Sequence, residues 1–218
     1  MRKLTISSLV AVVITLHAAA ASAQACLGLP SFVNGSVHAN VAVFQLTDSV
    51  QSVAVGLGAG RPNHLFANIG GAQVTYEGFD EKSTLGFLEF GYQIPVSRLQ
   101  LCPIAGGYLA AGPDDGLMKI TSRVASAGLA AGLPITMGSF RIIPNAAFKY
   151  DYESTKFVEE GFEDETITSN SQGIDLGLGF VFADRFGLQP IVHLPLSSSD
   201  SDPSFGIFAS VSFGWRAK

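Results

Sequence analysis

Hydrophobic and polar residues alternate with a period of two along most of this chain, and turn residues separate the alternating runs. Apolar residues occupy every odd position from Phe205 to Trp215, and the even positions carry mostly Gly and Ser, with Phe208 as the exception. The run from Gly173 to Phe182 repeats this pattern. No segment combines a sustained 3.6-residue period with capping residues. The sequence therefore predicts an all-β fold.

Ten such runs can be counted, which is an even number. The predicted strands lie near residues 36–46, 51–60, 64–76, 84–94, 99–110, 118–132, 139–152, 172–182, 186–196 and 204–215. An alternative with eight strands arises if short or kinked runs merge, for instance at Gly70-Gly71. Strands of about ten residues with one apolar and one small or polar face are typical of a closed, antiparallel transmembrane β-barrel.

A soluble secreted barrel, with its aliphatic residues inside, is the rival architecture. The chain is 47% hydrophobic but only 14% charged, against about 25% charged in an average soluble domain. Too few charges lie well within the predicted strands to solvate an outer wall; they are Glu89, Lys119, Arg123, Arg141, Lys149 and Asp175. A closed barrel also satisfies its backbone hydrogen bonds without water. The composition therefore favours the membrane barrel.

The first 23 residues have the pattern of a secretory signal peptide. Arg2 and Lys3 precede an apolar stretch from Leu4 to Leu16, and Ala21-Ser22-Ala23 offers a small-x-small cleavage site. An uncleaved membrane anchor is the alternative, although the apolar stretch is short for one. We divide the chain into a signal peptide (1–23), an N-terminal periplasmic segment (24–34) and a barrel domain (35–218). Removing the two basic residues changes the net charge from −5 to −7, which disfavours nucleic-acid binding.

The only two cysteines, Cys26 and Cys102, remain after cleavage. An exported protein meets an oxidising compartment, so we expect a disulfide in preference to two free thiols. It would close a loop of about 75 residues, a constraint the entropic model values at about 4 kcal/mol. The apolar segment Gln24 to Asn34 lies outside the alternation, and we expect it to enter the periplasmic mouth as a plug held by this disulfide.

The connections between the predicted strands also alternate in character. Every second one is tight and carries few acids, whereas 15 of the 18 acids lie in or beside the others. Short turns at one end and longer loops at the other are typical of outer-membrane barrels, whose short turns are periplasmic. The segment 151–170 carries seven acids and is expected to form a long external loop at 153–170. A solvated cap explains its acids better than a weak divalent-cation site, and Phe157 and Phe162 suit contact with a partner or with lipid headgroups.

The chain resembles the outer-membrane β-barrel superfamily, in its group of small OmpA-like or porin-like barrels. The resemblance covers residues 24–218 and is carried by the signal peptide, the ten alternating strands, the acidic loops and the aromatic end Phe213-Gly214-Trp215. In that superfamily the last strand carries an assembly signal that ends in an aromatic residue, which implies the barrel-assembly machinery as a partner. Here Arg216-Ala217-Lys218 follow Trp215, and Ser210 stands where a glycine is often found.

Charges of both signs are expected to meet inside the barrel as a polar network of Glu89, Arg123, Arg141, Lys149 and Asp175. The alternation adds further polar residues to the lumen, namely Asn40, Gln93, Gln100, Asn145, Gln189 and His193. Unpaired burial of charge is expensive, so the charges should pair and fill the passage. The alternative is a narrow channel that favours anions, because the bases outnumber the acids in this set.

No catalytic motif accompanies the histidines of the mature chain, His38, His64 and His193. His193 precedes the serines at 197–199, but no Gly-x-Ser-x-Gly, His-Glu-x-x-His or phosphate-binding loop is present. We therefore expect no enzyme, no cofactor and no metal site.

Taken together, the sequence predicts a monomeric outer-membrane β-barrel of a Gram-negative bacterium. Its expected partners are outer-membrane lipid, the assembly machinery and an extracellular ligand bound through the loop 153–170. The predicted role is structural or surface-interacting, with a narrow or filled polar lumen. A small porin for ions or small solutes is the alternative, and a lipid-modifying enzyme is the third.

Overall fold

The computed structural model describes residue 26 and residues 36–47, 49–60, 64–77, 82–114, 118–159, 161, 163–197 and 202–214. The predicted signal peptide lies outside these residues, as does the predicted plug segment 24–34 except for Cys26. Twelve strands form one sheet. They are β1 (Ser36–Thr47), β2 (Val50–Gly60), β3 (Leu65–Tyr76), β4 (Lys82–Tyr92), β5 (Ile94–Val96), β6 (Leu99–Asp114), β7 (Met118–Gly132), β8 (Ile135–Met137), β9 (Phe140–Glu159), β10 (Glu165–Phe182), β11 (Phe186–Pro195) and β12 (Ser204–Gly214).

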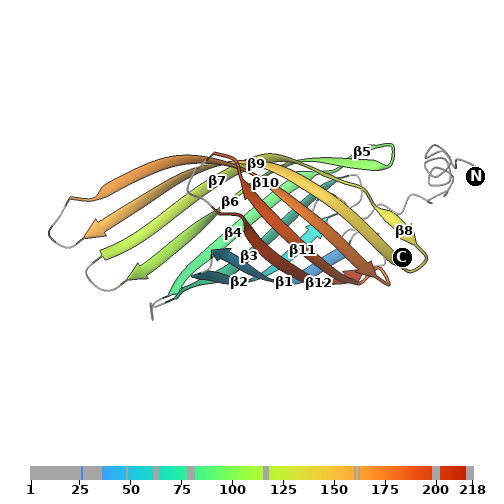
Figure 1. Cartoon of the computed structure of the whole chain (residues 1–218), viewed down its shortest axis with the longest axis horizontal. Coiled ribbons are helices and arrows are strands. Elements are labelled where there is room, and N and C mark those ends of the chain that lie inside the picture. Colours follow the sequence, from blue (N-terminus) through green and yellow to red (C-terminus); the bar gives the residue numbers. More distant parts are fainter. Residues whose placement is uncertain are drawn as a thin grey trace, which may run out of the picture.

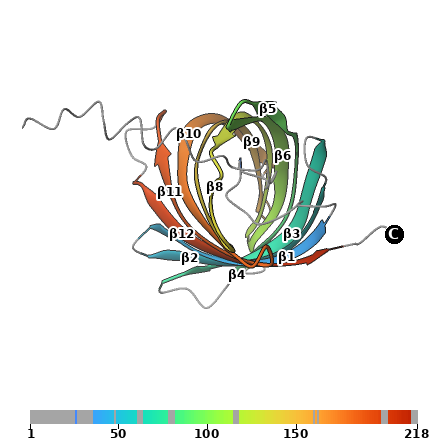
Figure 2. The ribbon, with the colours of Figure 1, turned by 90° about the vertical axis from the view of Figure 1, so that its right-hand side faces the viewer.

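Ten of these strands are long, and each pairs antiparallel with the next long strand along the chain. The first and last strands also pair, in register from Ser36↔Gly214 to Gln45↔Phe205. The sheet therefore closes into a ring, which Figure 2 shows. The predicted ten-stranded barrel is confirmed. The eight-stranded alternative is wrong, because Gly70 and Gly71 pair in unbroken register within β3.

Two short strands extend the barrel at the end with the short connections. β5 pairs with the beginning of β6, and β8 pairs with the beginning of β9. The sequence predicted plain turns in both places, where the structure has short ladders that close at Ser97 and Gly138, both with positive φ. We call this the short-turn end and the opposite one the acidic end. Among the described residues, no helix is long and apolar enough to cross a membrane.

The segment 153–170 is a β-hairpin, so the prediction of a long external loop there is wrong. β9 continues to Glu159, β10 begins at Glu165, and the two strands pair as far as Phe157↔Glu165. This hairpin projects at the acidic end (Figure 1). Thr and Ile favour extended backbone, but both faces of the projecting part are largely polar, with Val158 and Ile167 as exceptions. The segment therefore lacks the alternation from which the other strands were recognised.

Side chains alternate between an inner face and an outer face of the barrel, and the outer face is the apolar one. In β2, Val53, Val55 and Leu57 are exposed, whereas Ser52 and Ala54, which alternate with them, are buried. Each of the ten long strands carries at least one large exposed apolar residue. This inverts the arrangement of a soluble protein, and it is the arrangement of a barrel whose outer wall contacts lipid. The predicted membrane barrel is confirmed over its soluble rival.

A charge on the outer wall tests this arrangement. Val55→Arg would place a guanidinium among the apolar side chains at mid-strand, and we expect it to destabilise the membrane-inserted barrel by about 2–4 kcal/mol. Gln73→Arg, on the outer face near the acidic end, should cost only about 0–1 kcal/mol. Urea titration of both variants refolded in phospholipid vesicles measures the difference. Equal effects would show that the outer wall does not contact hydrocarbon.

Candidate functional site

A chain of ionic side chains crosses the inside of the barrel at mid-height. Lys149 on β9 lies at its centre, with Nζ 3.4 Å from Oε2 of Glu89 on β4 and 3.2 Å from Oδ2 of Asp175 on β10. The side chains of Lys149, Glu89 and Asp175 are 28%, 25% and 14% exposed. One cation therefore pairs with two carboxylates inside the barrel, which stabilises both of their charges.

His193 on β11 extends this chain. Its Nδ1 lies 2.7 Å from Oδ1 of Asp175, the residue opposite it in the β10–β11 ladder. The imidazole ring lies over Gly173, where an added Cβ would come within 2.3 Å of the ring. Gly173 thus leaves the space that the histidine occupies. His193 was predicted to face the lumen, and its contact with Asp175 joins β11 to the network.

Arg141 also faces inward, but it lies at the short-turn end and has a different partner. Its Nη2 donates to Oδ1 of Asp184 at 2.8 Å, and the Arg141 side chain is almost fully buried. Asp184 belongs to the β10–β11 turn, where Ala183 and Asp184 both have positive φ and the Arg185 N–H donates to the Phe182 carbonyl. Asp tolerates this left-handed backbone. Sequence reasoning missed Asp184 because it assigned the turn no partner.

Arg123 does not belong to the network, and its predicted place in the lumen is wrong. It pairs across the ladder with Leu109 and Ser154, and both Arg123 and Leu109 are exposed on the outer face. Small residues occupy both faces of this part of β7, so the alternation did not show which of its residues face the lumen. Arg123 lies near the acidic end of the barrel, and this position explains why a charge is tolerated on the outer face.

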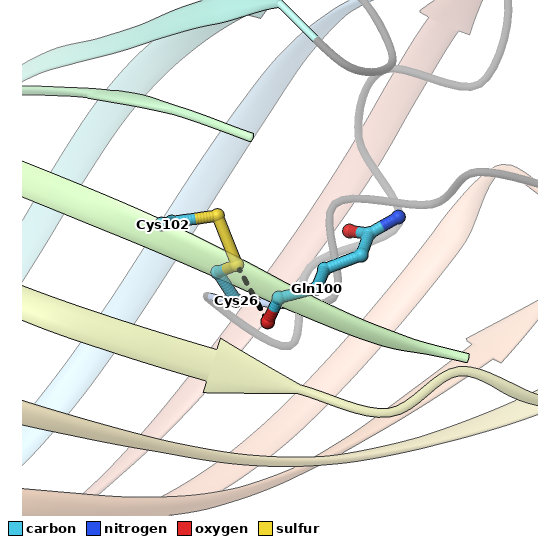
Figure 3. Close-up of a disulfide and its surroundings, with 3 residues drawn as sticks. All are labelled: Cys26, Gln100 and Cys102. Carbon is cyan, nitrogen blue, oxygen red and sulfur yellow. Dashed lines mark hydrogen bonds between the residues drawn. A yellow bond between two sulfur atoms is a disulfide. The ribbon is translucent and has the colours of Figure 1, made fainter. Parts of the chain in front are cut away.

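An apolar cluster fills the inside below the ionic residues, on the side of the short-turn end. Phe66, Ile104, Ala130 and Ala147 are buried together with the disulfide Cys26–Cys102, whose Cα atoms are 6.1 Å apart. Figure 3 shows Cys102 on β6 turned toward Cys26. The Cys26 Sγ lies 3.5 Å from the Gln100 carbonyl oxygen. The sequence predicted this disulfide, but it did not predict apolar side chains inside the barrel.

Buried amides and an imidazole lie near the same level. Gln189 Nε2 donates to Asn145 Oδ1 at 3.2 Å, and both amides lie over Gly177, where an added Cβ would come within 2.6 Å of each. His38 on β1 is fully buried and lies over Gly58 in the same way. Bulky inward-facing side chains thus occupy the space that glycines on the adjacent strands, which carry no side chain, leave inside the barrel. The inside of the barrel is packed at this level.

The Ser197 hydroxyl accepts a hydrogen bond from the Gln172 N–H at 2.7 Å, and residues 198 and 199 lie outside the described part of the chain. Across the residues that the structure describes, no group of three His, Cys, Asp or Glu side chains could hold a metal ion. His64 lies just before β3, outside the network.

Comparisons with known proteins find structural likeness only. No protein-family model matches the sequence, and no curated protein matches it significantly. The β-domain of the Bordetella autotransporter BrkA is 14% identical, with a TM-score of 0.48, over 83% of this chain and 100% of that one. The translocator domain of the autotransporter NalP from Neisseria meningitidis is 11% identical, with a TM-score of 0.48, over 83% and 87%.

The N-terminal β-barrel domain of OprF from Pseudomonas aeruginosa is also similar, at 9% identity and a TM-score of 0.37 over 82% of this chain and 99% of that one. These likenesses are loose. The assignment of the chain to the outer-membrane type of β-barrel follows from its closed ladder of strands and its apolar outer face.

Removing the central cation tests the ionic chain. Lys149→Met leaves Glu89 and Asp175 without their shared partner, and we expect it to destabilise the barrel by about 2–4 kcal/mol, since breaking a buried ion pair is costly. The triple variant Lys149→Met/Glu89→Gln/Asp175→Asn should recover most of this loss, because it removes the uncompensated charges as well. Urea titration in vesicles measures both; a triple variant no more stable than Lys149→Met would contradict the pairing.

Proposed function

We propose that this protein is an outer-membrane barrel with a closed lumen and a structural or surface-interacting role. The observation that carries this proposal is the position of Cys26. Cys26 lies ten residues before Ser36, the first residue of β1, yet it is buried among inward-facing side chains of β3, β6, β7 and β9. Cys26, bonded there to Cys102, occupies space that a pore would need.

Packing of the barrel wall supports closure. A ten-stranded barrel is only slightly wider than an eight-stranded one, whose inside is just wide enough for its own side chains. Here the inner face carries aromatic rings in addition to Phe66, and Phe44 and Phe208 meet edge to face with centroids 5.0 Å apart. Tyr108 is also mostly buried on this face. These rings occupy the lumen closer to the acidic end than the apolar cluster does.

Orientation follows from the two ends. In the proposed orientation the short-turn end is periplasmic, and both barrel termini lie there because the number of strands is even. The disulfide then lies near the compartment where such bonds form. The hairpin of β9 and β10 extends outward as a paired, pre-ordered structure, which suits binding of an extracellular ligand better than a long loop would.

A small porin is the second candidate, and one observation favours it. Lys149, Glu89 and His193 keep 25–40% of their side-chain surface accessible, so water reaches the ionic chain. With Arg123 outside and Arg141 bound to Asp184, the acids Asp151 and Glu153 add to this inner face. Any conduction should therefore favour cations, rather than the anions that the surplus of bases suggested.

We also propose that the protein is not an enzyme. The Asp175–His193 pair resembles part of a hydrolytic triad, but its carboxylate is shared with Lys149, which suits a structural ion pair. A lipid-hydrolysis assay with His193→Ala as the control tests this: activity in the wild type that the substitution abolishes would overturn it.

Single-channel recording of the refolded mature protein in a planar bilayer tests closure. We expect no steady conductance steps from the oxidised protein, because Cys26 and the apolar cluster occupy the lumen. Reduction, or Cys26→Ser, should produce steps and lower the stability by about 2–4 kcal/mol, because the tether is lost.

The double variant Cys26→Ser/Cys102→Ser is the control, since reductant should leave its conductance unchanged. Steady steps from the oxidised wild type would overturn closure and establish the porin, and their reversal potential in a salt gradient would then report its ion selectivity. Silence in every state would assign the closure to the barrel's own side chains instead of the tether.

A further inference from the structure

The outer face of β7, β9 and β10 changes in character from mid-barrel to the acidic end. Successive cross-strand triplets on this face run Leu129–Phe148–Ile174, Ala127–Tyr150–Gln172, Ala125–Tyr152–Asn170, Arg123–Ser154–Thr168 and Thr121–Lys156–Thr166. The series passes from hydrocarbon side chains through exposed tyrosines to hydroxyls and cations. Tyrosines of this kind lie at the boundary between hydrocarbon and headgroups, so the cations lie just outside that boundary.

Three cations gather in this outermost region, namely Lys119, Arg123 and Lys156, and all three are exposed. Lys156 is paired with Thr121, so Lys119 and Arg123, two positions to either side of Thr121, are its diagonal neighbours at about 7–8 Å. Lys156 has a carboxylate partner in Asp164, and Lys119 lies opposite Asp114 in the β6–β7 ladder. Arg123 lies opposite Leu109 and Ser154 and makes no ion pair within the described part of the chain. Its guanidinium is thus left facing the membrane surface.

The positive charge of these three cations is opposite to the charge of their surroundings. Most acids of the protein lie at this end, yet the register turns Asp151 and Glu153 to the inner face and Arg123 and Lys156 to the outer face. Like charges that are diagonal neighbours on adjacent strands, as Arg123 and Lys156 are, repel each other. An anion held between them would remove this repulsion, and Arg in particular matches the geometry of phosphate.

We propose that this surface, formed by Lys119, Arg123, Lys156 and the hydroxyls of Thr121, Ser154, Thr166 and Thr168, binds the phosphate-bearing headgroup of a lipid in the adjacent leaflet. The cations contact the phosphate, the hydroxyls contact the polar headgroup, and the acyl chains lie along Leu129, Phe148 and the two tyrosines. The inference rests on insertion of the barrel in a membrane. It does not depend on whether the lumen conducts.

Native mass spectrometry of the refolded mature protein in neutral detergent, with lipid A added, measures this binding. Lipid A is a bisphosphorylated, acylated glucosamine disaccharide, and its dephosphorylated form is the matched ligand. We expect the wild type to prefer the phosphorylated form and the preference to weaken as ammonium acetate is raised. Lys119→Gln/Arg123→Gln should weaken binding of lipid A by about fivefold for each cation removed, and Lys119→Arg/Arg123→Lys should retain it.

Lys82→Gln/Arg185→Gln is the control with matched charge. Lys82 lies on the outer face of β4 and Arg185 in the β10–β11 turn, and this variant should bind lipid A as the wild type does. If both double variants lost lipid A binding equally, the net charge of the protein would explain the binding and the proposed site would be overturned. If the wild type bound the dephosphorylated lipid equally well, phosphate recognition would be overturned. Heat-modifiable migration on gels verifies that each variant is folded, so lost binding is not lost structure.

Discussion

Every other feature of this structure depends on one constraint, which is that backbone N–H and C=O groups in hydrocarbon must be satisfied within the protein. The ladder between β1 and β12 meets it by joining the ends of the sheet. Once the ring is closed, each strand must present one face to lipid and one to the lumen. The two-residue period of the sequence is the direct consequence, and it is why Val53, Val55 and Leu57 of β2 are exposed whereas its buried residues are small.

Closure then creates a second problem, because the enclosed face must be filled by side chains drawn from ten different strands. The structure solves it by placing large groups over glycines of the adjacent strand, such as His193 over Gly173 and His38 over Gly58. At mid-height the charges lie beside partners, as Lys149 does between two carboxylates. The lumen is therefore layered, with an apolar cluster around the disulfide toward the short-turn end and an ionic chain above it.

The fold could be predicted from the sequence because a strand with an apolar lipid face and a small-residue inner face leaves a clear local pattern. The disulfide could be predicted from two cysteines in an exported chain. Arg123 could not be placed, since β7 carries small residues on both faces and the assumption that charges face inward was the only guide. Asp184 and the apolar cluster were missed because their contacts join residues far apart in sequence, and no local signal marks them. The β9–β10 hairpin was missed for a related reason, since both of its faces are polar where it leaves the membrane.

The position of Arg123 changes how charge is distributed between the inner and outer faces of the barrel. With this residue in the lumen, bases would outnumber acids there. With it outside, the two carboxylates of Glu89 and Asp175 share Lys149, and Asp151 and Glu153 add further acids to the inner face. The same shift leaves cations on the outer face of β7 and β9, at the level where hydrocarbon gives way to headgroups. Toward the acidic end the charges are thus separated by face: Asp151 and Glu153 lie on the inner face, and Arg123 and Lys156 lie on the outer face. Such a separation follows from electrostatics at an interface, since a cation beside anionic headgroups is stabilised by them whereas a carboxylate there is not.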